Sequence, residues 1–215
     1  HASLMRKARE MSGTVVISIF VNPIQFGPGE DFETYPRDEA RDVALAESEG
    51  VDVVFIPAVQ EMNPQPTKTK ISVAKITSLL CGASRPGHFD GVTTVVSKLF
   101  NIIKPDYAFF GMKDAQQVAV IEQMVRDLNM DVTIVPCPII READGLALSS
   151  RNVYLKPEER EQALVLSGSL RTAQEANQQG QAATAGEIRA HLREYISRSP
   201  LADIEYAELL TFPEL

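Results

Sequence analysis

Four short apolar runs, separated by segments with helical spacing, constrain the fold of this chain more than any other feature. They lie at residues 14–21, 51–56, 106–110 and 132–135. The first run is rich in β-branched residues and has almost no polar positions, which is typical of a strand covered on both faces in a parallel sheet. Strands that alternate with helices form such sheets through crossover connections. The sequence therefore predicts an α/β fold with a doubly wound parallel sheet.

Segments with helical character fill the intervals between these runs. Gly50 and Pro105 mark two of their ends, since glycine is favoured just past the last turn and proline cannot continue a helix. After residue 114, apolar side chains recur at a spacing of three and four residues. The helices predicted in this part of the chain span residues 3–11, 34–50, 93–104 and 115–128.

The sequence changes character near residues 136–141. Beyond this point two polar amphipathic helices are predicted at 157–178 and 185–197, and a weakly alternating run at 204–210 predicts a last strand. The change divides the chain into a larger α/β domain and a smaller C-terminal α+β domain, with predicted bounds of 1–139 and 140–215.

Composition and charge exclude several classes of protein. The formal net charge of −8 and the pI of about 5.0 argue against a general nucleic-acid binder, which needs a basic surface. Cys81 and Cys137 are far apart and have no metal-binding spacing, so we expect buried, reduced thiols and a cytoplasmic protein. We expect neither a membrane span, which needs ~20 apolar residues, nor a signal peptide. The sequence begins at His1 without an initiator methionine, so we expect the true N-terminus to lie upstream.

A glycine turn at a helix start provides the first candidate site. Gly111 follows the run at 106–110, and Lys113 and Asp114 stand directly before the helix at 115–128. The free backbone N–H groups and the dipole of a helix N-terminus favour an anion such as phosphate. Lys113 would add a mobile positive charge, and Asp114 would accept hydrogen bonds from ribose hydroxyls. The alternative is that Asp114 only caps the helix and Lys113 only faces solvent.

Ser149, Ser150 and Arg151 form a second cluster that is suited to anions. Two hydroxyl donors stand beside a guanidinium, whose planar fork matches phosphate oxygens. The alternative is a serine turn that merely precedes a helix. Finding this cluster in the same chain as Lys113 favours a phosphate-binding role for both.

Gln25 stands just beyond the end of the first predicted strand. Open parallel sheets bind ligands beyond the carboxyl ends of their strands, and the amide of Gln25 is suited to a substrate carbonyl or hydroxyl. The alternative is that Asn22 and Pro23 simply build a turn here.

Three further features remain ambiguous in the sequence. Asp42 is a candidate Mg²⁺ ligand, or one residue of an acidic helix start. The glycine-bracketed segment 85–91 is predicted as a loop before a helix capped by Asp90, either a mobile flap or an ordinary connection. His1 is either the remnant of a tag or a functional residue that directly precedes an amphipathic helix.

Several segments, taken in order, are more specific together than any of them is alone. They are residues 18–31, 35–37, 85–92, 113–114 with 116–117, and 149–152. In this order they resemble the pantothenate synthetase (pantoate–β-alanine ligase) family of the HIGH-signature nucleotidyltransferases, over the whole chain. The resemblance places His1 at the second histidine of that signature. The first strand of the sheet and a short C-terminal piece are therefore expected to be missing from this sequence.

The resemblance implies a Rossmann-like domain at 1–139 that binds nucleotide and pantoate, and a lid domain at 140–215. It implies the ATP-dependent condensation of pantoate with β-alanine to pantothenate, a step of coenzyme A biosynthesis. The reaction would pass through a pantoyl adenylate and release AMP and diphosphate. Mg²⁺ is expected with ATP, and a cytoplasmic homodimer is expected from the family. No nucleic acid or membrane partner is expected.

The resemblance also assigns roles to individual residues. His1, Lys113 and Arg151 would be catalytic, because adenylyl transfer needs charge neutralisation and alignment more than covalent help. Gln25 and Gln117 would bracket pantoate. The residues implied to contact ATP, followed by the implied metal ligand, are Gly111, Met112, Lys113, Asp114, Ile140, Leu148, Ser149, Ser150, Arg151 and, for the metal, Asp42.

This chain departs from the family pattern at a few positions. Met112 stands where the family usually has Glu, Ala115 where an aromatic residue is common, and Leu148 where Met is common. None of these changes removes a charged catalytic group, so they bear on affinity more than on chemistry. Phe26 is the candidate apolar wall for the methyl groups of pantoate.

Two rival functions stay open. One is another adenylyl transferase of the same superfamily, which would place AMP on a nucleotide. The other is a non-catalytic nucleotide-binding or interaction protein, which would bind ATP without releasing diphosphate.

Overall fold

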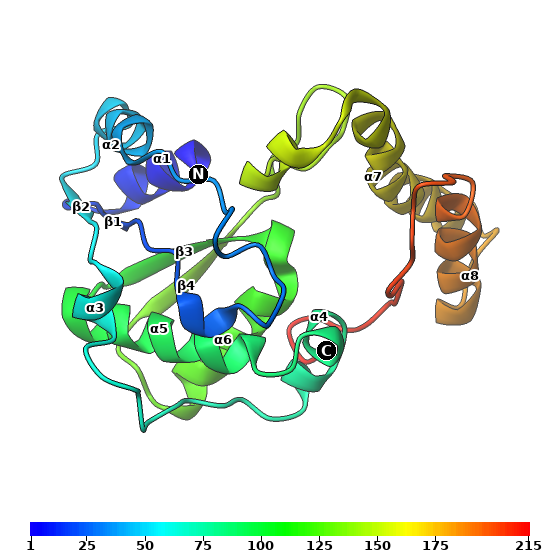
Figure 1. Ribbon diagram of the computed structural model, residues 1–215. Coiled ribbons are helices and arrows are strands. Elements are labelled where there is room, and N and C mark those ends of the chain that lie inside the picture. The colour runs from blue at the N-terminus through cyan, green and yellow to red at the C-terminus, as the bar shows by residue number, and fades with distance from the viewer. The chain divides into compact units, whose positions relative to one another are not determined.

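The computed structural model describes residues 1–215 as two compact units (Figure 1). The first unit contains residues 1–138 and 212–215, and the second contains residues 139–211. Each unit has its own cluster of buried apolar residues.

The first unit alternates helices and strands. Its elements, in chain order, are α1 Ala2–Met11, β1 Val16–Ser18, the 3₁₀ turn η1 Pro23–Gln25, α2 Glu39–Ser48, β2 Val53–Phe55, α3 Val59–Met62, η2 Ile76–Ser78, α4 Cys81–Ser84, α5 His88–Ile103, β3 Tyr107–Gly111, η3 Met112–Asp114, α6 Ala115–Asp127 and β4 Thr133–Cys137.

The four strands form two parallel pairs, which confirms the prediction of an α/β fold with parallel strands. Val16 of β1 is opposite Val53 of β2, and Tyr107 of β3 is opposite Thr133 of β4. No hydrogen bond joins one pair to the other. The continuous doubly wound sheet of the prediction is therefore not present, because no strand among these residues pairs with both β1 and β3.

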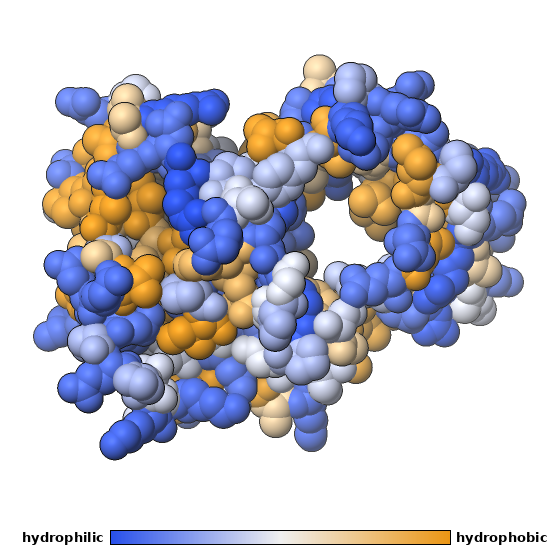
Figure 2. Space-filling model, viewed as in Figure 1, coloured by the Kyte–Doolittle hydropathy of each residue, from blue (hydrophilic) through white to orange (hydrophobic).

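The strands are also less buried than their sequences predict. Val53 is 49% exposed and Tyr107 is 40% exposed. Each strand has only one strand beside it, so its other edge and part of its faces stay open. Figure 2 shows apolar atoms gathered over the β1–β2 side of this unit, where Val53 and Ile56 are among the exposed apolar residues.

The core of the first unit lies along the contact of α5 and α6. Both helices place apolar side chains at a spacing of three and four residues, so that each has one apolar face. Val92 and Ile121 are almost completely inaccessible to solvent. The buried members of the cluster are Val73, Phe89, Val92, Val96, Val120, Ile121 and Met124.

Helix α5 begins five residues earlier than predicted, at His88. Gly87 precedes its first turn with φ +83°, a conformation that glycine adopts at little cost. Asp90 lies inside the first turn, where its carboxylate accepts from Lys70 Nζ at 2.7 Å and from Ser72 Oγ at 2.6 Å. The prediction of a loop at 85–91 capped by Asp90 is therefore wrong, because its second half is helical.

The second unit is helical. It contains the 3₁₀ turn η4 Ser150–Tyr154, α7 Pro157–Gln178 and α8 Ala185–Ile196, and α7 packs against α8. The predicted strand at 204–210 is wrong, because this segment is irregular and has no strand beside it with which to pair. Its Ala207 is nevertheless buried with Leu192 of α8. The α+β prediction for this part of the chain is corrected accordingly.

Helix α5 approaches η1 so closely that Gly91 has no room for a side chain. A Cβ on Gly91 would lie 2.7 Å from Gln25 Cα and 2.8 Å from Gln25 N. Asn22, which is 2% exposed, spans the contact and donates from Nδ2 to Gly91 O at 3.2 Å. The backbone of η1 is thus fixed directly against the first turns of α5.

We expect Gly91→Ala to destabilise the protein by roughly 1–3 kcal/mol, the usual cost of overpacking. The methyl group meets backbone atoms, which cannot rotate away, and this cost exceeds the roughly 0.5–1 kcal/mol that alanine gains over glycine inside a helix. Urea denaturation measures the difference. Gly186→Ala in α8 is the matched control, since its new Cβ would meet only Thr184 Oγ1 at 4.0 Å. Equal stability of G91A and the wild type would contradict the close contact.

Candidate active site

Several polar elements meet at one edge of the first unit. Strand β1 leads into η1, and β3 leads into η3 and then α6. Helix α5 ends just before β3 begins, so its first turn lies toward the edge at which β3 ends (Figure 1). Ligands of open parallel sheets bind at this carboxyl edge.

Gln25 lies at the end of η1 and is half-buried. Asn22 caps this turn, with Oδ1 accepting from Ile24 N at 3.3 Å. Its amide nitrogen also lies 3.5 Å from Gln25 Oε1. The turn that the sequence offered as an alternative is therefore present, and Gln25 is its last residue.

A charged network holds η1 from behind. His88 Nδ1 lies 2.9 Å from Gln25 O, and Arg85 Nη1 lies 3.2 Å from His88 Nε2. A guanidinium N–H only donates, so Nε2 accepts and Nδ1 carries the proton that is donated to Gln25. Arg85 also binds both carboxylate oxygens of Glu30. This arrangement fixes one tautomer of His88.

Burial is the main influence on the protonation of His88. It lowers the pKa of the imidazole, and the positive charge of Arg85 lowers it further, although the bond to Gln25 O and the charges of Glu30 and Asp114 act in the opposite direction. The hydrogen bond from Arg85 lowers the pKa of the Glu30 carboxyl in turn.

The glycine turn after β3 is present as predicted. Gly111 ends β3, and Asp114 occupies the N-cap position of α6, yet its side chain makes no hydrogen bond to the helix. Lys113 Nζ lies 3.5 Å from Asp114 Oδ1, and both side chains are well exposed. Asp114 is thus the N-cap residue by position and Lys113 is exposed, as the alternative has it, but the Asp114 side chain leaves the N–H groups of the helix N-terminus open to an anion.

Neighbouring glutamines at the start of α6 differ in their surroundings. Gln116 is buried, and its Nε2 donates to Ile76 O at 2.9 Å and to Leu79 O at 2.7 Å. Gln117 is only partly buried and makes no side-chain hydrogen bond. Gln116 thus holds the segment around η2, while the amide of Gln117 remains available to a ligand.

His1 lies at the N-terminal end of α1, and its carbonyl accepts from Leu4 N at 2.9 Å. Helix α1 packs against β3, and its C-terminal end lies shortly before the start of β1. Its N-terminal end, with His1, therefore lies toward the carboxyl edge of the strands. The side chain of His1 is exposed.

The residues do not form a metal site on their own. No group of three or more His, Cys, Asp or Glu side chains could hold a metal ion. Asp42 lies in the first turn of α2, after Asp38, whose side chain caps this helix by accepting from Arg41 N at 3.1 Å. This geometry fits the alternative of an acidic helix start.

In the second unit, Ile140 and Leu148 flank a hairpin and are joined by a 2.9 Å hydrogen bond from Leu148 N to Ile140 O. Both side chains are exposed, by 43% and 51%. Ser149, Ser150 and Arg151 follow directly. Ser149 Oγ accepts from Arg151 N at 3.2 Å, so the predicted serine turn exists, and the hydroxyl of Ser150 makes no hydrogen bond in the protein.

The predicted site residues fall in both units. His1, Gln25, Asp42, the segment 111–114 and Gln117 belong to the first, and Ile140 with 148–151 belong to the second. Sequence reasoning missed the residues behind the site, notably Arg85, Glu30 and His88. Glu30 and Arg85 are 55 positions apart, and no local spacing signals such a pair.

Neither cysteine forms a disulfide. Cys137 is buried, as predicted, and burial raises the pKa of its thiol. Cys81 is only partly buried and contacts Arg85 Nη1 at 3.9 Å. None of the helices is both long enough and apolar enough to cross a membrane.

Comparisons with known proteins agree with one another. The family model described as Pantoate-beta-alanine ligase matches residues 1–215. The pantothenate synthetases of Pelotomaculum thermopropionicum and Heliobacterium modesticaldum are 57% and 58% identical to this chain; they align with 100% and 98% of it and with 76% and 74% of their own lengths.

Solved structures give the same result. The pantothenate synthetase of Thermus thermophilus superposes with a TM-score of 0.90 at 48% identity, over 93% of this chain and 72% of its own. The pantoate-beta-alanine ligase of Francisella tularensis, complexed with beta-gamma ATP and beta-alanine, superposes with a TM-score of 0.78 at 37% identity, over 90% and 72%. This chain belongs to the pantoate-beta-alanine ligase family.

Proposed function

We propose that this chain catalyses the ATP-dependent condensation of pantoate with β-alanine, which yields pantothenate, AMP and diphosphate. The observation that carries the proposal is the family match over residues 1–215. The open helix N-terminus beside Lys113 and the partly buried amide of Gln117, which makes no side-chain hydrogen bond, fit the same substrates.

The chemistry divides into two displacements. A carboxylate oxygen of pantoate attacks the α-phosphorus of ATP, and the bond to the bridging oxygen of diphosphate breaks. The amine of β-alanine then attacks the carbonyl carbon of the pantoyl adenylate and expels AMP, while the amine loses a proton. Both steps need alignment and charge stabilisation rather than a covalent protein intermediate.

The cationic and hydroxyl groups suit the first step. In the proposal, Lys113 and the N-terminus of α6 bind phosphate oxygens of ATP, and Arg151 with Ser150 contributes further donors. His1 donates to the phosphates as negative charge builds. Asp114, whose side chain does not cap α6, accepts from the ribose hydroxyls.

Apolar and amide groups of the protein suit the adenine ring of ATP and pantoate. Ile140 and Leu148 offer an exposed apolar surface for the adenine ring. The amides of Gln25 and Gln117 orient pantoate without the salt bridge that would hold its carboxylate back from attack. Phe26 packs edge-on against Phe32, with 5.4 Å between the ring centroids. It is the proposed apolar wall for the methyl groups of pantoate.

Magnesium enters the proposal only as the counter-ion of ATP. The protein side chains alone do not fit a metal site, and Mg²⁺ is commonly held by substrate phosphates with one or two carboxylates. Asp42 remains the proposed carboxylate ligand, and no step of the mechanism depends on it.

The remaining expectations concern the assembly. We propose that residues 140–215 act as a lid that excludes water from the acyl adenylate, as closing domains do in many enzymes. The homodimer and the cytoplasmic location remain predictions from the family.

Product analysis of the full-length protein tests the function. With ATP, Mg²⁺, pantoate and β-alanine, we expect pantothenate, AMP and diphosphate in equal amounts. A dinucleotide formed from ATP and a second nucleotide would favour the rival adenylyl transferase. ATP binding without diphosphate release would favour the binding protein.

We expect Lys113→Ala to lower kcat about 100- to 1000-fold, the usual loss when one donor to the transition-state charge is removed. Lys113 is exposed, and its ammonium lies 3.5 Å from Asp114 in a surface pair of the kind that contributes little, so thermal stability should not change. Steady-state kinetics measure kcat, and thermal denaturation measures the melting temperature. Lys68→Ala, in an exposed loop, is the control and should keep wild-type rates. Activity of K113A within threefold of the wild type would refute this role.

We expect the KM for pantoate to rise in acid, as the pH falls through the pKa of His88 in the folded protein, which lies below the ordinary histidine value of about 6.5. The folded state lowers the pKa of His88, so its neutral form is favoured. Protonation of Nε2 in acid places a second positive charge beside Arg85 and removes the acceptor of the Arg85 hydrogen bond, which weakens the support behind Gln25. The part of the folding stability that depends on neutral His88 is fully present at neutral pH. It is lost as the pH falls from the pKa of this histidine in the unfolded chain toward its lower pKa in the folded protein.

His88→Asn provides the control for this pH effect. The amide nitrogen of asparagine can occupy the place of Nδ1 and donate to Gln25 O, but it does not titrate. The KM for pantoate of H88N should therefore be close to the wild-type value at neutral pH and flat toward acid. An identical acid rise in H88N and the wild type would assign the effect to another group.

A further inference from the structure

The segment with Ser149, Ser150 and Arg151 lies between a tight hairpin and α7. The hairpin spans residues 140–148, and Glu142 N donates to Leu146 O at 2.8 Å within it. Gly145 turns the chain with φ +98°. The segment itself has little burial to hold it, since Arg151 is exposed and both serines are only partly buried.

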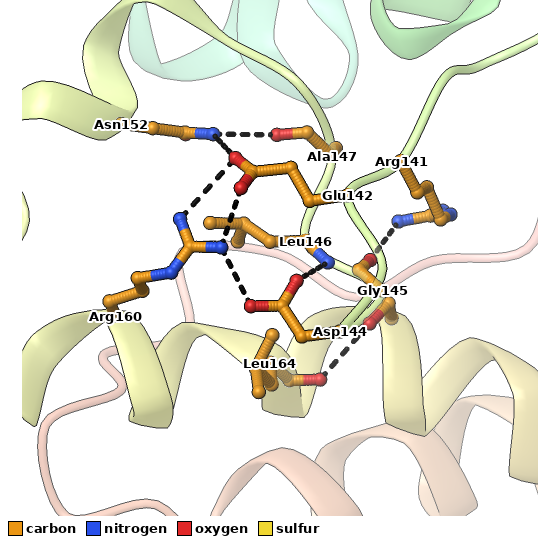
Figure 3. A network of polar contacts seen from close by, with 10 residues as sticks. Arg141, Glu142, Asp144, Gly145, Leu146, Ala147, Asn152, Arg160 and Leu164 are labelled. Carbon is orange, nitrogen blue, oxygen red and sulfur yellow. Dashed lines mark hydrogen bonds and ion pairs between the residues drawn. The ribbon is translucent and has the colours of Figure 1, made fainter. Parts of the chain in front are cut away.

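Arg160, in the first turns of α7, binds two carboxylates of the hairpin (Figure 3). Its Nη2 lies 2.7 Å from Glu142 Oε2 and 2.6 Å from Asp144 Oδ2, and its Nη1 lies 3.3 Å from Glu142 Oε1. One guanidinium therefore joins both acidic side chains to the helix. Lysine could not reproduce the fork, because its ammonium is a compact point charge without the planar arrangement of donors.

Asn152 extends the network to the far end of the segment. Its Nδ2 donates to Glu142 Oε1 at 3.1 Å and to Ala147 O at 3.0 Å (Figure 3). Asn152, which follows Arg151, is thus bound to Ala147, which precedes Leu148. The segment 148–151 is a short loop closed at both of its ends.

Every carboxylate oxygen in the network has a donor. Asp144 Oδ1 accepts from Leu146 N at 3.1 Å, and the other three oxygens accept from Arg160, with Asn152 adding to one of them. The bond from Arg160 lowers the pKa of Glu142, and the Leu146 N–H and then Arg160 lower that of Asp144. The negative charge of Asp144 repels that of Glu142 and raises its pKa. The two carboxylates therefore need Arg160 between them to stay close together.

We propose that Arg160 is a positioning residue for ATP, which acts through Glu142 and Asn152 to hold the segment 149–151 in the shape that binds phosphate. The inference rests on the proposed function, because it assigns phosphate binding to that segment. Arg160 itself touches no reacting atom in this scheme.

Kinetics of Arg160→Ala and Arg160→Lys in the full-length protein test the inference. We expect the KM for ATP to rise about 10- to 100-fold in R160A, since a misplacement of about 1 Å can cost about 100-fold. The KM for pantoate should stay unchanged, because Gln25 and Gln117 belong to the other unit. R160K should fall between R160A and the wild type.

A merely structural role predicts a different pattern. It would lower the melting temperature and the fraction of active enzyme, and would leave the KM for ATP unchanged, which would overturn the inference. Arg189→Ala is the matched control, since Arg189 pairs with Glu208 at 3.2 Å in the same unit but contacts no residue of the network. It should keep both KM values.

Two further outcomes are decisive. If R160A does not fold, Glu142→Gln carries the test, because it keeps the size of the side chain and removes the charge that Arg160 binds; an unchanged KM for ATP in E142Q would overturn the inference. If the wild type forms no pantothenate, the proposed function fails, and this role fails with it. An active wild type with an unaffected R160A would refute the inference alone.

Discussion

The contact between the backbone of α5 at Gly91 and the backbone of Gln25 is the constraint on which the candidate site depends. Because no side chain fits between them, the position of η1 follows the position of α5. Helix α5 is in turn fixed by its apolar face against α6, where Val92 and Ile121 are almost completely buried. The polar edge of the first unit is therefore set by the apolar core behind it.

A second layer of polar contacts refines that placement. His88 donates to Gln25 O and accepts from Arg85, and Arg85 binds Glu30, so three charged or titratable groups support one backbone carbonyl. The second unit has a comparable arrangement, in which Arg160 supports the segment 149–151 through two carboxylates and Asn152. In both units, groups that bind no substrate in our proposal hold those that do.

The sequence predicted the parts of this structure whose signals are local. The parallel strands and the helix at 157–178 follow from apolar spacing and from Pro157, and α7 has these bounds. Its failures have physical reasons. The alternation at 204–210 is weak, and a strand needs a partner, but none lies beside this segment. The start of α5 was misplaced because Gly87 and His88 carry no strong helix propensity, although tertiary contacts extend the helix through them.

The candidate site shows the same division. Gly111, Lys113 and Asp114 were found because a glycine turn at a helix start is visible in a short stretch of sequence. The sequence alone could not distinguish Gln116 from Gln117, since their difference lies in the carbonyls of Ile76 and Leu79, about forty positions away. The sequence does not signal the roles of Arg85 and Arg160, because the carboxylates that they bind are distant in the chain and resemble any other acidic residue in the sequence.

The most direct test of the central claim, that the carboxylate of pantoate attacks the α-phosphorus of ATP at this site, follows an oxygen atom. Pantoate labelled with ¹⁸O in its carboxylate is converted with ATP and β-alanine, and the AMP is analysed by mass spectrometry. Transfer of one labelled oxygen from each pantoate to AMP is the predicted result, because that oxygen bridges carbon and phosphorus in the adenylate. Unlabelled AMP formed along with pantothenate would contradict the account.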